Sequence, residues 1–127
     1  MTGQRVLVVE DNAKNLKLVS DVLGFAGYEV IAAESGERGV ELAVEQAPDL
    51  VLMDLQLPGI DGTEALRRLR ALPQTQDVPI VAVTAFAMQA DRERAFESGF
   101  DGFVEKPISV RGLLEQVRRF LAGEGST

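Results

Sequence analysis

The chain alternates between short apolar, β-branched runs and longer stretches in which apolar residues recur at helical spacing. Five of the short runs have the length and composition of buried strands. These runs are Arg5–Val9, Glu29–Ala33, Leu50–Met53, Pro79–Val83 and Gly102–Val104. Regular alternation of strand and helix favours a parallel sheet whose two faces are both covered by helices. We therefore predict an α/β fold built on five parallel strands.

Apolar residues at helical spacing mark the helices that should follow these strands. One face is shared by Leu16, Val19, Leu23 and Ala26, a second by Val40, Ala43, Val44 and Ala47, a third by Ala65, Leu66, Leu69 and Leu72, and the last by Leu113, Leu114, Val117, Phe120 and Leu121. The fourth helix, near Met88 to Ser98, is polar and thinly apolar, so we expect it to pack least firmly. Helix boundaries are marked by N-cap candidates and by glycines at the expected ends: Asn12, Ser35 and Ser109, then Gly27 and Gly99.

Length and charge limit the classes of function. With 127 residues the chain should form a single domain, spanning 1–127 with a core from about 4 to about 122. A formal net charge of −7 argues against sequence-independent binding to nucleic acid and against an anionic membrane surface. The sequence shows neither a signal peptide nor a membrane-spanning run, so we expect a cytoplasmic protein.

The chain contains no cysteine and no histidine, which removes whole classes of chemistry. Disulfides, thiolate nucleophiles, Ser–His–Asp triads and histidine-ligated zinc are all excluded. Covalent chemistry is left to Asp, Glu, Lys, Ser, Thr or Tyr. A metal site, if present, should be a carboxylate site for a hard cation.

Charged residues stand just past the ends of three of the predicted strands. The acidic pair Glu10–Asp11 follows the first strand, Asp54 the third and Lys106 the fifth. Because ligands bind outside the carboxyl ends of the strands in an open parallel sheet, these side chains should meet. Carboxylates so placed repel one another by roughly 4 kcal/mol per pair at ~4 Å and an effective dielectric of 20. The pattern therefore predicts an oxygen-seeking divalent cation beside a reactive aspartate.

Each of these residues, taken alone, has a plainer interpretation. The acidic pair is typical of a solvated turn at a helix N-terminus, where anions are favoured. Asp54 and Lys106 could form a purely structural salt bridge, although a charge at the end of a buried strand is costly unless it is paired. Thr84 is typical of a strand and Phe103 of a core. It is the conjunction of these residues that favours a functional site.

Four motifs occur in order along the chain: VVEDN, LMDLQLPGIDG, VAVTAFAM and FVEKPIS. Together they resemble the receiver domain of two-component response regulators over nearly the whole chain, and VAVTAFAM with EKPISV is most similar to the DivK-like single-domain regulators. The resemblance implies a flavodoxin-like (βα)5 fold with a doubly wound parallel five-stranded sheet in the order 2-1-3-4-5.

The resemblance also implies a phospho-acceptor and a metal site. Asp54 would accept a phosphoryl group and form an aspartyl phosphate. Asp11, Asp54 and the backbone carbonyl of Gln56 would bind Mg²⁺, with Mn²⁺ as an alternative ion. Glu10 would help to hold the metal, directly or through water.

Further roles follow from the same resemblance. Lys106 would neutralise the phosphoryl oxygens, and its peptide bond to Pro107 would be cis. The Thr84 hydroxyl, with Ala85 beside it, would contact the phosphoryl group once the adduct forms. Phe103 would then swing inward as part of the switch.

The chain departs from the commoner family pattern at Glu10 and Phe103, and two further positions bear on hydrolysis of the adduct. Glu10 stands where Asp is more frequent, and its longer side chain could hold the metal differently. Phe103 stands where Tyr is often found, so its ring has no hydroxyl and the switch would depend on packing. Gln56 and Phe86 would border the path of a hydrolytic water, and Phe86 cannot orient one. We therefore predict a long-lived aspartyl phosphate, which self-dephosphorylation within seconds would contradict.

The function implied is a stand-alone signalling switch rather than an enzyme, limited to Mg²⁺-dependent self-phosphorylation and slow self-dephosphorylation. Because the chain has no histidine, the phosphoryl donor must be a sensor histidine kinase, a histidine phosphotransfer protein or a small acyl phosphate. Output would pass by protein contact through the face of the fourth helix, fifth strand and fifth helix, with Ala87, Met88 and Val110 as candidate contacts. We expect a monomer, with a phosphorylation-dependent dimer as the alternative. The arginines of the last helix are interpreted as a solvated face, with partner docking as the alternative: Arg111, Arg118 and Arg119.

Other functions are weaker on the sequence. A Mg²⁺-dependent aspartyl-phosphate phosphatase of the haloacid-dehalogenase type resembles Asp-x-Asp at the nucleophile, whereas here the second position is Gln56. A flavin-binding module would need a Ser/Thr-rich phosphate loop after the first strand, where the acidic EDN instead repels phosphate. The chain also lacks a G-x-G-x-x-G for a dinucleotide. A further alternative is that the chain is a piece of a larger hybrid kinase. The leading Met and the short tail argue against this alternative.

Overall fold

The computed structural model describes residues 3–85 and 88–122. Within these residues it forms five strands, β1 (Arg5–Val9), β2 (Glu29–Ala33), β3 (Leu50–Asp54), β4 (Ile80–Thr84) and β5 (Gly102–Glu105). They alternate with the helices α1 (Ala13–Phe25), α2 (Gly36–Gln46), α3 (Gly62–Arg70), α4 (Gln89–Ser98) and α5 (Val110–Leu121). In this part of the chain no helix is long and apolar enough to cross a membrane.

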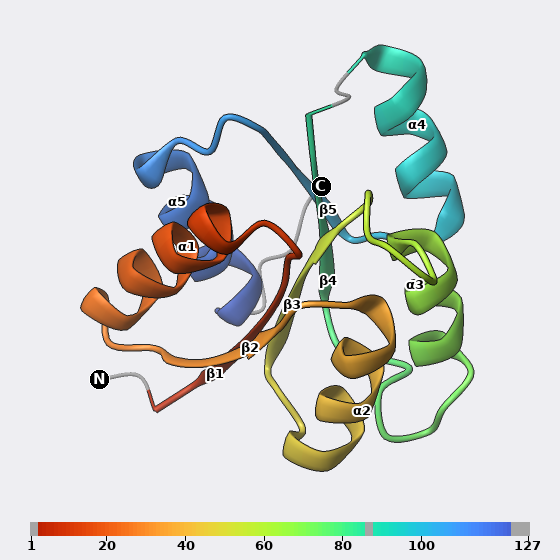
Figure 1. Cartoon of the computed structure of the whole chain (residues 1–127), viewed down its shortest axis with the longest axis horizontal. Coiled ribbons are helices and arrows are strands. Elements are labelled where there is room, and N and C mark those ends of the chain that lie inside the picture. Colours follow the sequence, from red (N-terminus) through yellow and green to blue (C-terminus); the bar gives the residue numbers. More distant parts are fainter. Residues whose placement is uncertain (1–2, 86–87, 123–127) are drawn as a thin grey trace.

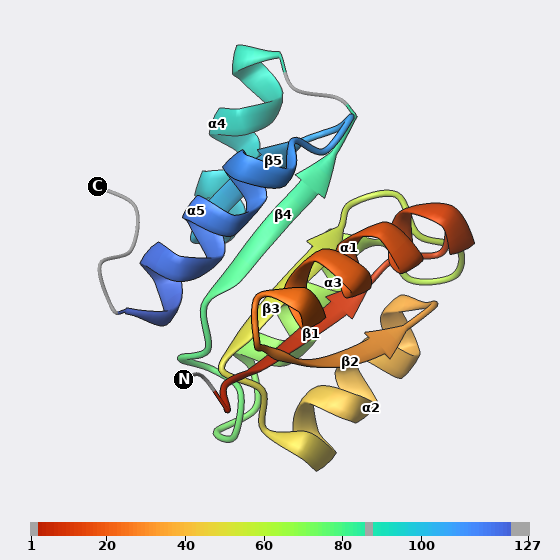
Figure 2. The same ribbon diagram turned by 90° about the vertical axis from the view of Figure 1, so that its left-hand side faces the viewer.

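The strands pair in parallel in the order β2-β1-β3-β4-β5, which confirms the predicted fold and strand order. Helices α1 and α5 cover one face of the sheet, and α2, α3 and α4 cover the other (Figures 1 and 2). The chain leaves every strand at the same edge of the sheet before it enters the following helix, so the carboxyl ends of all strands lie together. This edge is where the sequence predicts the site.

Two strand ends differ from the predicted boundaries in a way that matters for the site. Asp54 closes β3 and pairs with Val83 in the ladder, while Thr84 closes β4 and pairs with Glu105. The sequence pattern places both residues just beyond their strands, because each is the first polar residue after an apolar run. The hydrogen-bonded ladder instead includes them, so the backbone of each is fixed by the sheet.

Alternate residues of the strands form two apolar cores, one on each face of the sheet. On the α1/α5 side the core includes Val8, Leu52 and Val83, and on the other side it includes Val9 and Met53. This alternation follows from the two-residue period of a strand. Because both faces are buried, the central strands β3 and β4 are buried along their whole length.

The predicted helix boundaries are largely confirmed. Asn12, Ser35 and Ser109 are the N-caps of α1, α2 and α5, and each side chain accepts hydrogen bonds from backbone N–H groups of the first turn. Gly99 ends α4 in the left-handed region at φ 116°. Helix α1 ends at Phe25, with Ala26 as its C-cap and Gly27 next at φ 98°; Ala26 is exposed and does not share the buried face as predicted.

The buried face of α2 was predicted only in part. Ala43 is buried as expected, but Val44 is 37% exposed and Ala47 is the exposed C-cap at φ 47°. The helix instead faces the core through Gly36, Gly39 and Leu42. A Cβ added to Gly39 would lie only 2.7 Å from a methyl carbon of the β1 residue Val9. Glycine brings the helix close to the sheet, and a pattern of large apolar residues does not detect such a face.

At the opposite edge of the sheet, an arginine at the end of α3 joins the starts of β4 and β5. Arg70 donates to the carbonyl oxygens of Val78 at 2.6 Å and Gly99 at 3.1 Å, and to Asp101 Oδ2 at 2.7 Å. Asp101 also accepts from the Ile80 N–H at 2.8 Å. This network ties α3 and the end of α4 to the starts of β4 and β5.

Candidate functional site

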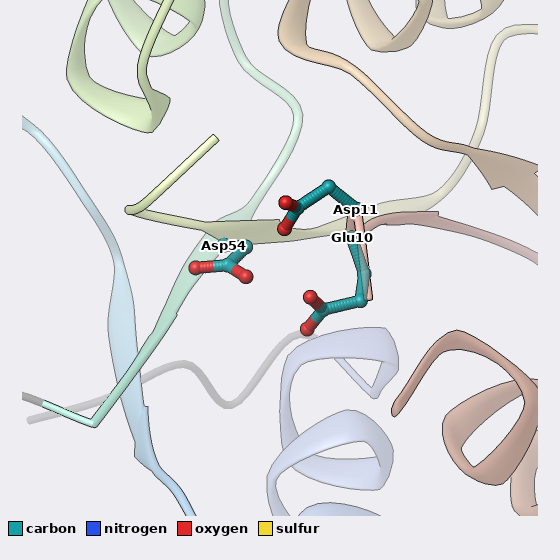
Figure 3. A group of neighbouring side chains, drawn as sticks. All are labelled: Glu10, Asp11 and Asp54. Carbon is teal, nitrogen blue, oxygen red and sulfur yellow. The ribbon is translucent and has the colours of Figure 1, made fainter. Parts of the chain in front are cut away.

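Three carboxylates converge at the carboxyl edge of the sheet (Figure 3). Glu10 follows β1 and Asp54 closes β3, and both residues are only 3% exposed, whereas Asp11 is exposed. One oxygen from each of the three lies within 4.8 Å of the others. The prediction that residues far apart in sequence meet at this edge therefore holds for these carboxylates.

Lys106 completes the group from the loop after β5. Its Nζ lies 2.9 Å from Asp54 Oδ2 and 3.0 Å from Glu10 Oε1, and its side chain is only 17% exposed. The ammonium thus bridges the two buried carboxylates. Its own backbone N–H donates to the Thr84 carbonyl oxygen at 2.8 Å, so the sheet ladder fixes the start of this loop.

Backbone N–H groups satisfy the remaining oxygens of the two buried carboxylates. The Gln56 N–H donates to Asp54 Oδ1 at 2.9 Å, and the Asn12 N–H donates to Glu10 Oε2 at 3.1 Å. Each carboxylate is therefore held at one oxygen by the lysine and at the other by the main chain. This arrangement fixes both groups in place, as a preorganised reactive site requires.

The environment alters the proton affinity of the lysine and of one carboxylate. Burial raises the pKa of Glu10, and its contact with Asp54 raises this pKa further, because both effects disfavour a second negative charge. Burial acts to lower the pKa of Lys106, but its hydrogen bonds to Asp54 and Glu10 outweigh burial and the net pKa is raised. Lys106 is therefore a fixed positive charge at neutral pH.

The donor set fits a hard divalent cation. Three carboxylates face one ammonium, so the group keeps an excess of negative charge, and all its ligand atoms are oxygens. Mg²⁺ prefers one or two carboxylates and keeps several waters. Asp11 lies on the exposed side of the cluster, where bound water would have access. The residues present thus suit Mg²⁺ chemically.

A glycine at the start of α3 lies directly against the end of β3. Gly62 is the first residue of α3, after the N-cap Asp61, whose side chain accepts from the Glu64 N–H. A Cβ on Gly62 would lie 2.5 Å from the Asp54 carbonyl oxygen and 2.9 Å from the Leu55 Cα. Only glycine lets α3 begin this close to the end of β3. The Asp-Gly pair after LPGI is the signal that locates this residue.

The remaining predicted site residues lie along β4 and β5. Thr84 is buried at the end of β4, next to a cavity of about 260 Å³ that Gln56 also lines, and Ala85 is exposed. The Lys106–Pro107 peptide bond is cis. Phe103 is 5% exposed, so its ring lies inside the core. The roles assigned to these residues remain predictions.

The predicted output surface is exposed where it is described. Met88 is 76% exposed and Val110 is 47% exposed. Phe86 and Ala87 lie outside the described residues, so what the sequence predicts for these two residues stays a prediction. The three arginines of α5 are exposed, as a solvated face requires: Arg111, Arg118 and Arg119.

Comparison with known families and proteins gives one consistent result. The family model described as response regulator receiver domain matches residues 6–118. The polar-differentiation response regulator DivK of Brucella ovis is 42% identical over 116 residues, which cover 91% of this chain and 94% of DivK.

Solved structures agree with the sequence comparisons. The receiver domain of the sensor histidine kinase PA1611 from Pseudomonas aeruginosa, with a magnesium ion coordinated in its active site cleft, has a TM-score of 0.88 and 36% identity. That match covers 95% of this chain and 99% of the other. The chemotaxis protein CheY4 of Vibrio cholerae has a TM-score of 0.88 and 27% identity, over 94% of this chain and 99% of CheY4.

Proposed function

The chain belongs to the response regulator receiver domain family, a family of signalling domains in two-component systems, and we propose that Asp54 is its phospho-acceptor. One observation carries the proposal. Asp54 is a buried carboxylate at a strand end, held by the Gln56 N–H and by Lys106, with Glu10 and Asp11 beside it. A salt bridge alone would not need two further carboxylates at the same place.

The proposed reaction transfers a phosphoryl group from a phosphohistidine to Asp54. A carboxylate oxygen of Asp54 forms the new bond to phosphorus while the bond from phosphorus to the histidine nitrogen breaks. The bonding electron pair stays with that nitrogen. Such a transfer depends mainly on positioning and on neutralisation of charge rather than on a strong nucleophile. Lys106, at 2.9 Å from the acceptor, is placed to pair with the incoming phosphoryl oxygens.

The proposed metal ligands are Asp11, Asp54 and the backbone carbonyl of Gln56, with Glu10 as a direct or water-mediated ligand. When bound, Mg²⁺ would supply positive charge to the phosphoryl oxygens; Mn²⁺ is the alternative ion. Asp54 and Glu10 are already oriented by backbone N–H groups, so these two side chains would lose little conformational entropy when the ion binds. Thr84 and Ala85 are proposed to contact the phosphoryl group after transfer.

The proposed partners follow from this chemistry. A sensor histidine kinase or a histidine phosphotransfer protein would supply the phosphoryl group in the cytoplasm. A downstream protein would read the face of α4, β5 and α5, where Met88 and Val110 are exposed. The proposal also includes Mg²⁺-dependent self-phosphorylation and slow self-dephosphorylation. The proposed oligomeric state is a monomer, with a phosphorylation-dependent dimer as the alternative.

The test is the intact mass of the protein after mixing with Mg²⁺ and a small acyl phosphate. We expect wild type to gain one phosphoryl group, Asp54→Ala to gain none, and omission of Mg²⁺ to abolish the gain. Asp21→Ala, which removes an exposed aspartate in a surface pair with Lys17, is the matched control and should gain the group as wild type does.

A gain that persists in Asp54→Ala would overturn the acceptor assignment. Continuous release of free phosphate without an adduct would favour turnover by a phosphatase. The family match and the relatives described above give that alternative no support, and Gln56 lacks the acidic group that its second aspartate would provide.

A further inference from the structure

An arginine from helix α4 covers the aromatic ring of Phe103. The guanidinium carbon of Arg92 lies 5.0 Å from the centre of the ring. Phe103 is buried, whereas Arg92 is exposed, so the guanidinium lies between the ring and solvent. A cation within about 6 Å of a ring centroid is attracted by the negative face of the ring. The contact therefore holds an aromatic side chain that carries no hydroxyl of its own.

This contact is one of few links between α4 and the sheet. Within α4, whose residues are all described, Ala95 alone is buried. Arg92 donates its backbone N–H to the Met88 carbonyl oxygen at 3.1 Å, so it belongs to the turn that opens the helix. A movement of the Phe103 ring would therefore act first on the position of the first turn of α4.

Phe103 is held from the neighbouring helix as well. The side chain of Gln116 in α5 donates to the Phe103 carbonyl oxygen at 2.8 Å. The backbone of this β5 residue is thus fixed from α5 while its ring is covered from α4. A single strand residue connects both helices of the proposed output face.

We propose that Arg92 is a positioning residue of the switch, which holds the Phe103 ring in its buried position and couples the orientation of α4 to that ring. This inference rests on the proposed function only for its second half, the passage of a signal from Asp54 to α4. The position of the ring is a property of the protein whether or not Asp54 is phosphorylated.

The first experiment measures how exposed the ring is. The six phenylalanines are labelled with ¹³C in the ring, and the Phe103 signals are assigned by their loss in Phe103→Leu. A soluble paramagnetic agent then reports solvent access through the relaxation of the ring protons. Arg92→Met keeps a long apolar cover but removes the charge, whereas Arg92→Lys keeps the charge.

We expect the relaxation enhancement of the Phe103 ring to rise about two- to fivefold in Arg92→Met. This is the factor by which loss of an exposed cation–π contact would raise the population of conformers with the ring exposed. Arg92→Lys should stay close to wild type. Arg94→Met is the matched control, because Arg94 lies on the same helix but pairs with Asp91 at 3.7 Å. An unchanged ring in Arg92→Met, an equal rise in Arg92→Lys or an equal rise in Arg94→Met would overturn the assignment.

The second experiment tests the coupling. Backbone amide shifts are recorded before and after phosphorylation, with intact mass as the measure of the adduct. In Arg92→Met we expect the response of α4 amides to fall at least twofold while the amides around Asp54 respond as in wild type. An α4 response equal to wild type in a phosphorylated Arg92→Met would refute the coupling. If wild type gains no mass, the proposed function fails, and the ring measurement still decides the role of Arg92.

Discussion

Replacing Lys106 by methionine should destabilise the fold far more than the same change at a surface lysine. The methionine keeps an unbranched side chain but removes the charge that bridges Asp54 and Glu10 at 2.9 and 3.0 Å. Two carboxylates that are 3% and 4% exposed in their side chains would then face each other without a cation. Removing one partner of a buried ion pair leaves the other as an uncompensated charge.

The size of the effect follows from distance and burial. Each contact at about 3 Å corresponds to roughly 6 kcal/mol of attraction at an effective dielectric of 20. Part of this is regained, because the variant no longer buries an ammonium and because Glu10 can take up a proton. Measured losses for broken buried pairs are about 3–5 kcal/mol. We expect Lys106→Met to lose about 3 kcal/mol of unfolding free energy at neutral pH, near the lower end of that range.

Urea unfolding at several pH values checks this expectation, with an unchanged slope as evidence that only stability has moved. The pKa of Glu10, already raised by burial and by Asp54, should rise further in the variant. A group with a raised pKa in the folded state stabilises the fold below its unfolded pKa and loses this contribution as pH rises through the folded pKa. The deficit of Lys106→Met should therefore be largest near neutral pH and shrink toward about pH 5.

The matched control is Lys17→Met. Lys17 pairs with Asp21 at the same distance of 2.9 Å, but both side chains are largely exposed, at 77% and 64%. An exposed pair of this kind is worth about 0–1 kcal/mol. Equal losses in the two variants, or a Lys106→Met deficit that does not change with pH, would refute the reasoning that burial makes the site lysine important.

Three further predictions concern the frame around the site. Gly62→Ala should cost about 1–3 kcal/mol in urea unfolding and slow phosphorylation of Asp54, because the new Cβ meets rigid backbone at 2.5 Å, whereas Gly24→Ala, with open space around it, should not destabilise. Arg70→Met should cost about 2–3 kcal/mol, since it removes charged hydrogen bonds at both 2.6 and 2.7 Å, and a loss below about 0.5 kcal/mol would contradict the role given to that network. The carboxyl of Glu64 should titrate with a pKa of about 2, because two arginines hydrogen-bond it, so its stabilising contribution is complete above 4.5 and lost as pH falls toward 2. High salt should move that midpoint upward in an NMR titration, because the arginines that pair with Glu64 are largely exposed and salt screens the pairs.

The sequence was sufficient to predict the fold and the meeting of the charged residues, for a physical reason. In a parallel sheet every strand ends at the same edge, so a charge after each apolar run is brought to one place whatever the detailed packing. Glu10, Asp54 and Lys106 could therefore be placed together before any coordinates were known. The strand boundary at Asp54 was one residue off, since pairing with Val83 rather than polarity decides where β3 ends.

Contacts that depend on close approach could not be predicted in this way. Gly39 and Gly62 let helices approach the sheet, but glycine has no side chain and leaves no mark in an apolar pattern. The interaction of Arg92 with Phe103 joins two residues on different elements, and an exposed arginine on a polar helix is usually solvated. Such features require the distances of the folded chain.

The two edges of the sheet differ in their charge balance, and strand pairing up to the carboxyl edge explains how a destabilising site is held there. At one edge Arg70 and Asp101 form a network in which the charges are balanced and hydrogen-bonded. At the other edge Glu10, Asp11 and Asp54 exceed the single charge of Lys106, so the group is short of positive charge as long as only the chain's own residues are counted. The strands that carry Glu10 and Asp54 stay paired up to their ends, Val9 with Met53 and Asp54 with Val83, so these ends cannot splay apart to relieve the repulsion. The excess negative charge is therefore retained as affinity for a cation, whose positive charge the proposed phosphoryl transfer to Asp54 would require.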